Sequence, residues 1–412
     1  MKTATRCVYL EGNGDPYNAI SPPIYQTSTF RQEKACEFGE YDYTRTANPT
    51  RSLVEHKLAA LESGDHACAF ASGMAAITAL TRTLKIGDHI VAGNDLYGGT
   101  VRLLDQVLSR SGISISYVDA TNLDEVHAAL TERTRLVLAE TPTNPLLRIT
   151  DVSKIADVAH SSGAILAVDN SMLSPCFQQP LVLGANVVIH SATKFLCGHS
   201  DVTAGALITN DPDLDQQFRF QQNAEGAGLA PFESWLLLRG IKTLALRAER
   251  QNASAKKIAQ LLTKHPAIEN VYYPGLTTHP GHLLHRFQAT GDGAVISFTT
   301  GDPLISQRVV SSTRLFNIAV SFGSVNSVIS LPAAMSHASI PDSLKGQLAP
   351  PPDLVRLSIG IEDVDDLIED LRHSLETAVP RKIGSTPRRS RTSMKPQSVS
   401  HTRSYLSCDL QR

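Results

Sequence analysis

The stretch that decides the fold is SATKFLCGHSD, residues 191–201, with Lys194 at its centre. The apolar run ANVVI at residues 185–189 precedes it, and its clustered β-branched residues without a helical period predict a buried strand. A lysine just beyond a strand end can reach a cleft. Loss of water there favours the neutral amine, which can form a Schiff base with a carbonyl compound. An ordinary solvated lysine is the alternative, so the rest of the chain must decide.

Composition limits the kinds of partner. The 412 residues carry a formal net charge of -2, with 42% hydrophobic and 19% charged residues. This balance gives no reason to expect nucleic acid or an acidic membrane as a partner, and the apolar runs are too short for a transmembrane helix. A small molecule is the expected partner.

The cysteines and the N-terminus indicate the compartment. The six cysteines form no CxxC pair, and no His/Cys cluster has metal-ligand spacing, which favours a reduced protein without a metal site. The first residues lack the apolar core of a secretory signal and contain acidic residues, unlike a transit peptide. We therefore expect a cytoplasmic protein.

Strand-like and helix-like segments alternate along the first half of the chain. The strand-like runs are residues 89–92, 113–118, 135–140, 164–169, 186–190 and 204–209. Such alternation predicts a mainly parallel sheet covered by helices on both faces, with ligands at the carboxyl ends of the strands. Glu140, Asp169 and Lys194 each lie at or just beyond one of these ends.

Four regions are expected. Residues 1–50, rich in Pro, Gly and Asn, should form an extended arm that contacts a neighbouring subunit, and residues 51–245 an α/β domain. Its first helix should have Thr50 as N-cap and stop near Gly64. A long helix is expected over residues 231–263, with an interruption at Gly240. It should lead into a smaller α+β domain of residues 246–379. The strands expected in this domain are residues 271–273, 293–299 and 355–359. The basic, Ser-rich residues 380–412 should be disordered.

Three further features suit a phosphorylated ring compound. The SGMAA segment at residues 72–76 places the N–H groups of Gly73 and Met74 at a helix N-terminus, which favours a phosphate, although it is also compatible with a plain turn. Asp169 could pair with a protonated ring nitrogen, or act as an ordinary turn or cap residue. The hydroxyls of Ser191 and Thr193 could hold an anion beside Lys194.

Tyr97 and Arg356 complete the set of chemically suggestive residues. Tyr97 follows a predicted strand and could lay its ring on a flat cofactor, with its hydroxyl free for proton transfer. Packing in the core is the alternative. Arg356 lies within a predicted strand, where a guanidinium is costly unless it binds an anion such as a carboxylate. A structural salt bridge is the alternative for this residue.

An ordered series of motifs resembles that of a known family. The motifs are YDYTRTANPTR, ASGMAA, ETPTNP, AVDNS, SATKFLCGHSDVTAG, LLLRGIKTL, SHASIP and LVRLSIGIED, spread over residues 15–378. This series resembles the pyridoxal-phosphate-dependent enzymes of cysteine and methionine metabolism. The resemblance implies an aspartate aminotransferase-like fold (fold type I) with a mainly parallel seven-stranded sheet and a smaller α+β domain. It also implies pyridoxal 5'-phosphate as cofactor and a homotetramer built from dimers that share active sites.

Position by position, the resemblance also implies roles for individual residues. Lys194 becomes the Schiff-base lysine, Asp169 the partner of the ring nitrogen and Tyr97 the stacking ring. The implied phosphate cup consists of Gly73, Met74, Ser191 and Thr193. Tyr43 and Arg45 match a pair that reaches the phosphate in the neighbouring subunit. Arg356, with Asn144 and Ser321, matches the group that holds the substrate carboxylate.

Two stretches bear on the reaction. The segments beginning at Gln222 and Phe316 resemble the plant and fungal type of cystathionine β-lyase. Many γ-lyases have Glu where this chain has Val320, before the turn SFGS. This difference favours β-elimination. The expected substrate is the amino-acid thioether L-cystathionine, and the products are homocysteine, pyruvate and ammonia. A γ-lyase, a γ-synthase and a cysteine-conjugate lyase remain alternatives, the last because prolines at residues 350–352 replace a Gly-containing loop. A retired enzyme that serves as a scaffold is the alternative of another class.

Overall fold

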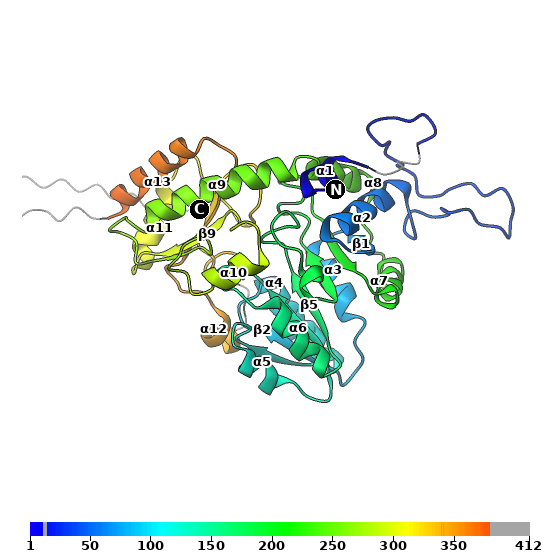
Figure 1. Ribbon diagram of the computed structural model, residues 1–412, viewed down its shortest axis with the longest axis horizontal. Coiled ribbons are helices and arrows are strands. Elements are labelled where there is room, and N and C mark those ends of the chain that lie inside the picture. The colour runs from blue at the N-terminus through cyan, green and yellow to red at the C-terminus, as the bar shows by residue number, and fades with distance from the viewer. Residues whose placement is uncertain (11–14, 339, 341, 380–412) are drawn as a thin grey trace, which may run out of the picture. The chain divides into compact units, whose positions relative to one another are not determined.

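A seven-stranded sheet lies at the centre of the structure, a computed structural model that describes residues 1–10, 15–338, 340 and 342–379 (Figure 1). Its strands are β1 (His66–Phe70), β2 (His89–Gly93), β3 (Ser114–Val118), β4 (Thr134–Glu140), β5 (Ile165–Asp169), β6 (Val187–His190) and β7 (Gly205–Thr209), in the spatial order β1-β7-β6-β5-β4-β2-β3. Neighbouring strands pair in parallel except at β7, which is antiparallel to both β1 and β6. The predicted mainly parallel sheet is confirmed.

Helices cover both faces of this sheet because successive strand residues point to opposite sides. They are α2 (Pro49–Glu62), α3 (Gly73–Thr81), α4 (Gly98–Leu103), α5 (Leu123–Ala129), α6 (Val152–Ser161) and α7 (Pro212–Ala224). On β2, Ile90 packs in the core that contains α3 and α4, whereas Val91 packs in the core that contains α6. Both strand residues are fully buried, as expected of a parallel sheet covered on two sides.

A second, smaller sheet follows the helices α8 (Pro231–Ile241) and α9 (Leu244–Leu262). Its strands are β8 (Asn270–Tyr272), β9 (Val295–Thr299), β10 (Asn317–Ile318), β11 (Val328–Ser330) and β12 (Val355–Ser358), in the order β10-β11-β12-β9-β8. The helices of this part are α10 (His282–Gln288), α11 (Pro303–Ser312), α12 (Asp342–Leu348) and α13 (Val364–Ala378). Residues 1–379 pack as one compact unit, so the domain boundary near residue 245 stays a prediction.

Two expectations for the N-terminal region were wrong. The arm is not extended throughout, because it contains the helix α1 (Thr3–Val8). In this helix Cys7 is buried, and the amine of Lys57 in α2 donates to the carbonyl of Arg6 at 2.6 Å. The N-cap of α2 is Asn48 rather than Thr50, and its side chain accepts from the Thr50 N–H at 2.9 Å. Proline at position 49 suits the first helical turn because its missing N–H needs no partner there.

The predicted long helix over residues 231–263 is two helices. Gly240 lies inside α8, and the break comes after Ile241. A Cβ at Gly240 would meet the carbonyl oxygen of Cys197 at 2.3 Å, so glycine permits α8 to approach the loop that carries Lys194. The predicted tail, residues 380–412, lies outside the described residues. In the part of the chain that is described, no helix is long and apolar enough to cross a membrane.

Candidate active site

Lys194 lies in the loop between β6 and β7. Within this loop the Lys194 N–H donates to the carbonyl of Ser191 at 3.0 Å, and the Gly198 N–H donates to the carbonyl of Lys194 at 2.8 Å. Arg247 of α9 donates to the carbonyl of Phe195 at 2.8 Å. The lysine is therefore carried by a loop with hydrogen bonds on both sides of it.

The Lys194 amine is in an environment that favours its neutral form. Its pKa is lowered to about 8 by burial and, to a lesser extent, by the charge of Arg356, while the charge of Asp169 acts in the opposite direction. The Nζ donates to the Oγ of Ser321 at 2.7 Å. A substantial fraction of the amine is thus unprotonated near neutral pH, as a nucleophile or a base requires.

A cavity of about 510 Å³ surrounds this amine. It brings together all of the predicted site residues except two: Lys194, Asp169, Tyr97, Gly73, Met74, Ser191, Thr193, Arg356, Asn144 and Ser321. They come from the carboxyl ends of the central strands, the start of α3, and the second sheet with the loop before it. The carboxyl ends of β4 and β5 therefore border this cavity.

Asp169, the last residue of β5, lies beside Glu140, the last residue of β4, in the strand ladder. Burial raises the pKa of Asp169, whereas hydrogen bonds from Ser171 and the nearby His190 and Lys194 lower it. The N–H of Ser171 donates to its carboxylate at 2.9 Å. These contacts hold Asp169 in place as an acceptor for a positively charged N–H group.

The start of α3 borders the cavity and has free N–H groups, as an anion site would require. Ser72 is the N-cap and its hydroxyl accepts from the Ala75 N–H, while the N–H groups of Gly73 and Met74 have no acceptor within the helix. A Cβ at Gly73 would lie 3.0 Å from the Cβ of Ser191, so the glycine allows this turn to approach the Lys194 loop. Thr193 also lines the cavity, and its hydroxyl donates to the carbonyl of Ala204 at 3.2 Å.

Arg356 places a buried guanidinium at the wall of the same cavity. It is 2% exposed, and it donates to the Oδ1 of Asn144 at 2.7 Å and to the carbonyl of Ser321 at 2.8 Å. Its Nε is buried without a hydrogen-bond partner. Burial lowers the pKa of Arg356 to about 10, which leaves the guanidinium charged at neutral pH. Among the described residues no carboxylate forms an ion pair with this buried cation, which suits an anionic ligand.

Sequence reasoning missed one residue that lines the cavity and one that contacts a lining residue. Glu140 was noticed only as a strand end, yet it lines the cavity and its carboxylate accepts from the Tyr97 N–H at 3.3 Å. Burial, together with Asp169 and Asp95, raises the pKa of Glu140 well above its ordinary value. Its position at a strand end next to Asp169 was the available signal.

His337, in the SHASIP motif, is the other missed residue. Its Nε2 lies 3.2 Å from the carbonyl of Asn144 and its Nδ1 2.9 Å from the Oγ of Ser336. The carbonyl can only accept, so Nε2 carries the proton and Nδ1 accepts from the serine. Burial lowers the pKa of His337 to about 4, so the neutral ring supports the Asn144 segment. No spacing rule in the sequence pointed to this contact.

Tyr43 and Arg45 are not brought into the cavity. Both are exposed, and they line a separate hollow of about 450 Å³ between the arm and the start of α8. The guanidinium of Arg45 lies 5.5 Å from the centre of the Tyr43 ring. The pair therefore does not reach the Lys194 cavity of its own chain.

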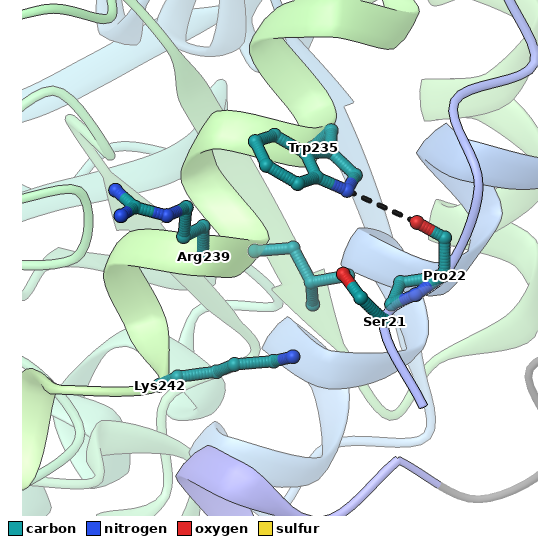
Figure 2. Close-up of a pocket in the computed structure, with 6 residues that line it drawn as sticks. Ser21, Pro22, Trp235, Arg239 and Lys242 are labelled. Carbon is teal, nitrogen blue, oxygen red and sulfur yellow. Dashed lines mark hydrogen bonds between the residues drawn. The ribbon is translucent and has the colours of Figure 1, made fainter. Parts of the chain in front are cut away.

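Another hollow, of about 360 Å³, lies where the arm meets α8 (Figure 2). Figure 2 shows the indole Nε1 of Trp235 pointing to the carbonyl of Pro22, to which it donates at 3.0 Å. Ser21, Arg239 and Lys242 complete the labelled wall. None of the predicted site residues lines this hollow, and its visible contact fastens the arm to α8.

The residues of the 510 Å³ cavity fit pyridoxal 5'-phosphate. They comprise an amine of lowered pKa for the aldehyde, a buried carboxylate for the ring nitrogen and helix N–H groups for the phosphate. In the described residues, no group of three or more His, Cys, Asp or Glu side chains could hold a metal ion. The fold and this set of donors define a pyridoxal-phosphate-dependent enzyme of fold type I.

The chain belongs to the family of Cys/Met metabolism PLP-dependent enzymes, whose model matches residues 4–376. Among its relatives, the chloroplastic cystathionine beta-lyase of Arabidopsis thaliana is 53% identical over 91% of this chain and 81% of that protein. The cystathionine gamma-lyase of Bacillus subtilis is 48% identical over 91% of this chain and 100% of that protein. The predicted resemblance to this family is confirmed.

A solved structure agrees with the fold. The crystal structure of cystathionine gamma-lyase from Lactobacillus plantarum, complexed with L-serine, superposes with a TM-score of 0.89 and 43% identity, covering 92% of this chain and 99% of that one. The protein is thus an enzyme that uses pyridoxal phosphate and acts on amino acids.

Proposed function

We propose that the protein is a carbon–sulfur lyase that cleaves L-cystathionine by β-elimination to homocysteine, pyruvate and ammonia. The observation that carries this proposal is a shared contact at Ser321. Its hydroxyl accepts from the Lys194 amine at 2.7 Å, and its carbonyl accepts from Arg356 at 2.8 Å. A substrate whose carboxylate binds Arg356 would therefore present its α-carbon to the Lys194 amine.

The chain's own residues divide the reaction between them. When bound, the cofactor supplies an electron sink that stabilises negative charge at the substrate α-carbon. Arg356 binds the carboxylate and Asn144 fixes the guanidinium, so that the α-proton faces Lys194. The amine of Lys194 removes that proton, and Ser321 orients the amine. Lys194 or the hydroxyl of Tyr97, which lines the same cavity, returns a proton to the departing sulfur.

Val320 favours β- over γ-elimination. It lines the cavity next to Ser321, the residue is 56% exposed, and its side chain supplies no charge to a distal substrate group. The named relatives include both a β-lyase and a γ-lyase, so γ-elimination is the second candidate. Mass spectrometry of the products from cystathionine decides between them. Homocysteine with pyruvate supports the proposal, and cysteine with 2-oxobutyrate contradicts it.

The assignment of Lys194 has its own test. Lys194→Ala should abolish turnover and the visible absorbance of bound pyridoxal phosphate. A variant that keeps both would refute the assignment. A colourless parent protein that binds no added cofactor would instead support the alternative of a retired scaffold.

We propose further that the enzyme is a homotetramer of dimers with shared active sites. The support is the position of Tyr43 and Arg45, exposed and outside the cavity of their own chain. A complementation experiment tests this. Mixed oligomers of Lys194→Ala and Arg45→Ala subunits should regain activity, because one site of a mixed dimer has both residues intact. No recovery would contradict the shared site.

A reducing compartment such as the cytoplasm is proposed as the location. The described cysteines, Cys7, Cys36, Cys68, Cys176 and Cys197, are free thiols, which is typical of reducing compartments. Cell fractionation with an antibody to the protein tests this. Recovery in a secreted or plastid fraction would contradict it.

A further inference from the structure

The ring of Phe322 lies beside two cationic side chains of the cavity. The centre of the ring is 5.1 Å from the Nζ of Lys194 and 5.4 Å from the Cζ of Arg356. Phe322 itself lines the cavity and is 7% exposed. The face of an aromatic ring carries partial negative charge and attracts a cation within about 6 Å of its centre. One uncharged side chain therefore contacts both the amine and the guanidinium on which the proposed reaction depends.

Contacts from two sides hold this ring in place. The ring of Phe195, the residue after Lys194, packs on it with 5.9 Å between the ring centres and 49° between the ring planes. The next residue, Gly323, donates its N–H to the Oγ of Ser358 in β12 at 2.8 Å. A Cβ at Gly323 would lie 2.7 Å from the backbone N of Phe195, so glycine permits this approach to the Lys194 loop. The ring is thus fixed by the same loop and the same strand that carry the two cations.

Repulsion between the two cations opposes protonation of the amine. The charge of Arg356, from β12, lowers the pKa of Lys194, whereas the charge of Asp169, from β5, raises it. Two further titratable groups of the cavity, Glu140 from β4 and Tyr97 before α4, act on Arg356. The negative charge on the face of the aromatic ring adds an attraction for a charged amine. The ring therefore stabilises an ammonium group that lies close to a guanidinium.

We propose that Phe322 is a positioning residue: its ring holds the Lys194 amine next to Arg356 by a cation–π contact and stabilises the amine once it is protonated. The second part rests on the proposed function, in which a proton moves from the substrate α-carbon to the Nζ of Lys194. The amine then carries a positive charge beside the guanidinium that binds the substrate carboxylate. The ring lowers the free energy of this charged state without adding an acid or a base to the cavity.

The test replaces Phe322 with mono-, di- and trifluorinated phenylalanine, incorporated at that single position. These side chains nearly keep the shape of phenylalanine, and each fluorine withdraws negative charge from the face of the ring, which weakens its attraction for a cation. The readout is the pH midpoint at which cofactor-free enzyme captures pyridoxal phosphate at Lys194, measured by borohydride trapping. The midpoint should lie near pH 8 in the parent and fall stepwise with each fluorine, by about 0.5 in all.

The direction of this change separates the proposal from a structural role. A weaker cation–π contact lowers the pKa of Lys194, so that more of the amine is neutral below the parent midpoint. At such a pH the trifluorinated protein should capture the cofactor up to about threefold faster than the parent. A ring that only fills space gives the same midpoint throughout the series. A packing defect slows capture at every pH and leaves the midpoint where it is. Either result overturns the proposal.

Phe298 supplies the matched control. It is a fully buried phenylalanine of β9 that does not line the cavity. The same fluorinated series at Phe298 should leave the midpoint unchanged. A midpoint that moves equally in both series would attribute the change to fluorine in the core and overturn the proposal.

Turnover gives a second readout, for the stabilisation of the protonated amine. At about pH 9 most of the amine is neutral in every protein of the series, because its pKa is about 8 or lower. At this pH, kcat for cystathionine should fall stepwise along the Phe322 series, by about threefold in all, with little change in KM. A constant kcat overturns this part of the proposal. A parent enzyme that does not cleave cystathionine refutes the proposed function instead, and the midpoint series then decides the contact between Phe322 and Lys194 by itself.

Discussion

The amine of Lys194 donates a hydrogen bond to the hydroxyl of Ser321 at 2.7 Å, although 127 positions separate the two residues. Lys194 follows the last strand of the parallel run, and Ser321 precedes β11 of the second sheet. Ser321 adopts a φ of 82°, in the left-handed region that a non-glycine residue seldom adopts. The reactive amine is therefore oriented by a segment from the other sheet, held in an uncommon backbone conformation.

Ser321→Ala should lower kcat by about tenfold while KM changes little. The substitution removes the acceptor that orients the Lys194 amine. The carbonyl that binds Arg356 belongs to the backbone and remains. Steady-state kinetics on cystathionine measure both parameters. An increase in KM with unchanged kcat would show that the hydroxyl serves substrate binding instead.

The covalent capture of pyridoxal phosphate by cofactor-free enzyme should speed up with rising pH, with a midpoint near the Lys194 pKa of about 8. The pKa is lowered from 10.5, so the neutral amine predominates above about pH 8 rather than above pH 10.5. Borohydride trapping at short times, followed by mass spectrometry, measures the rate. Lys194→Arg should trap no cofactor at this position. A midpoint near pH 10 would contradict the buried environment of the amine.

Gly73→Ala should weaken cofactor binding by about tenfold or more. The added methyl would lie 3.0 Å from the Cβ of Ser191 and 3.1 Å from its Cα, so the proposed phosphate site must widen. Gly346→Ala is the matched control, because nothing lies within 4 Å of a Cβ there. Equilibrium titration of the cofactor-free variants gives both Kd values. Equal affinity in the two variants would argue against a phosphate site at the start of α3.

The enzyme should lose stability as the pH falls from about 6.5 to about 4, and His337→Gln should reduce that loss. The pKa of His337 is lowered from 6.5 to about 4 in the folded protein. The neutral ring therefore contributes fully to the free energy of unfolding above pH 6.5, and this contribution is lost as the pH falls to the folded-state pKa of about 4. The loss of unfolding free energy that is due to His337 is about 3 kcal/mol. Urea unfolding at several pH values measures it. An unchanged pH slope in the variant would show that His337 is not the group responsible.

Much of the large sheet was predictable because each strand carries its own signal. The predicted run at residues 135–140 and strand β4 of the structure differ by only one residue at the start. Strands β10 and β11 escaped notice because they have two and three residues, too few for a periodic pattern. The cap at Asn48 was missed because Thr50 is also a favoured capping residue, and only the backbone distinguishes them.

The sequence by itself determined the class of the enzyme. Local patterns identify the ends of the strands, and the ordered motifs that contain Lys194, Asp169 and Arg356 identify the family of the chain. Only the tertiary structure decided the environment of these residues. The lowered pKa of Lys194, the unpartnered Nε of Arg356 and the aromatic ring of Phe322 beside both residues all arise from contacts between distant segments. Burial and charge depend on what surrounds a group in space, and no linear spacing in the chain contains that information.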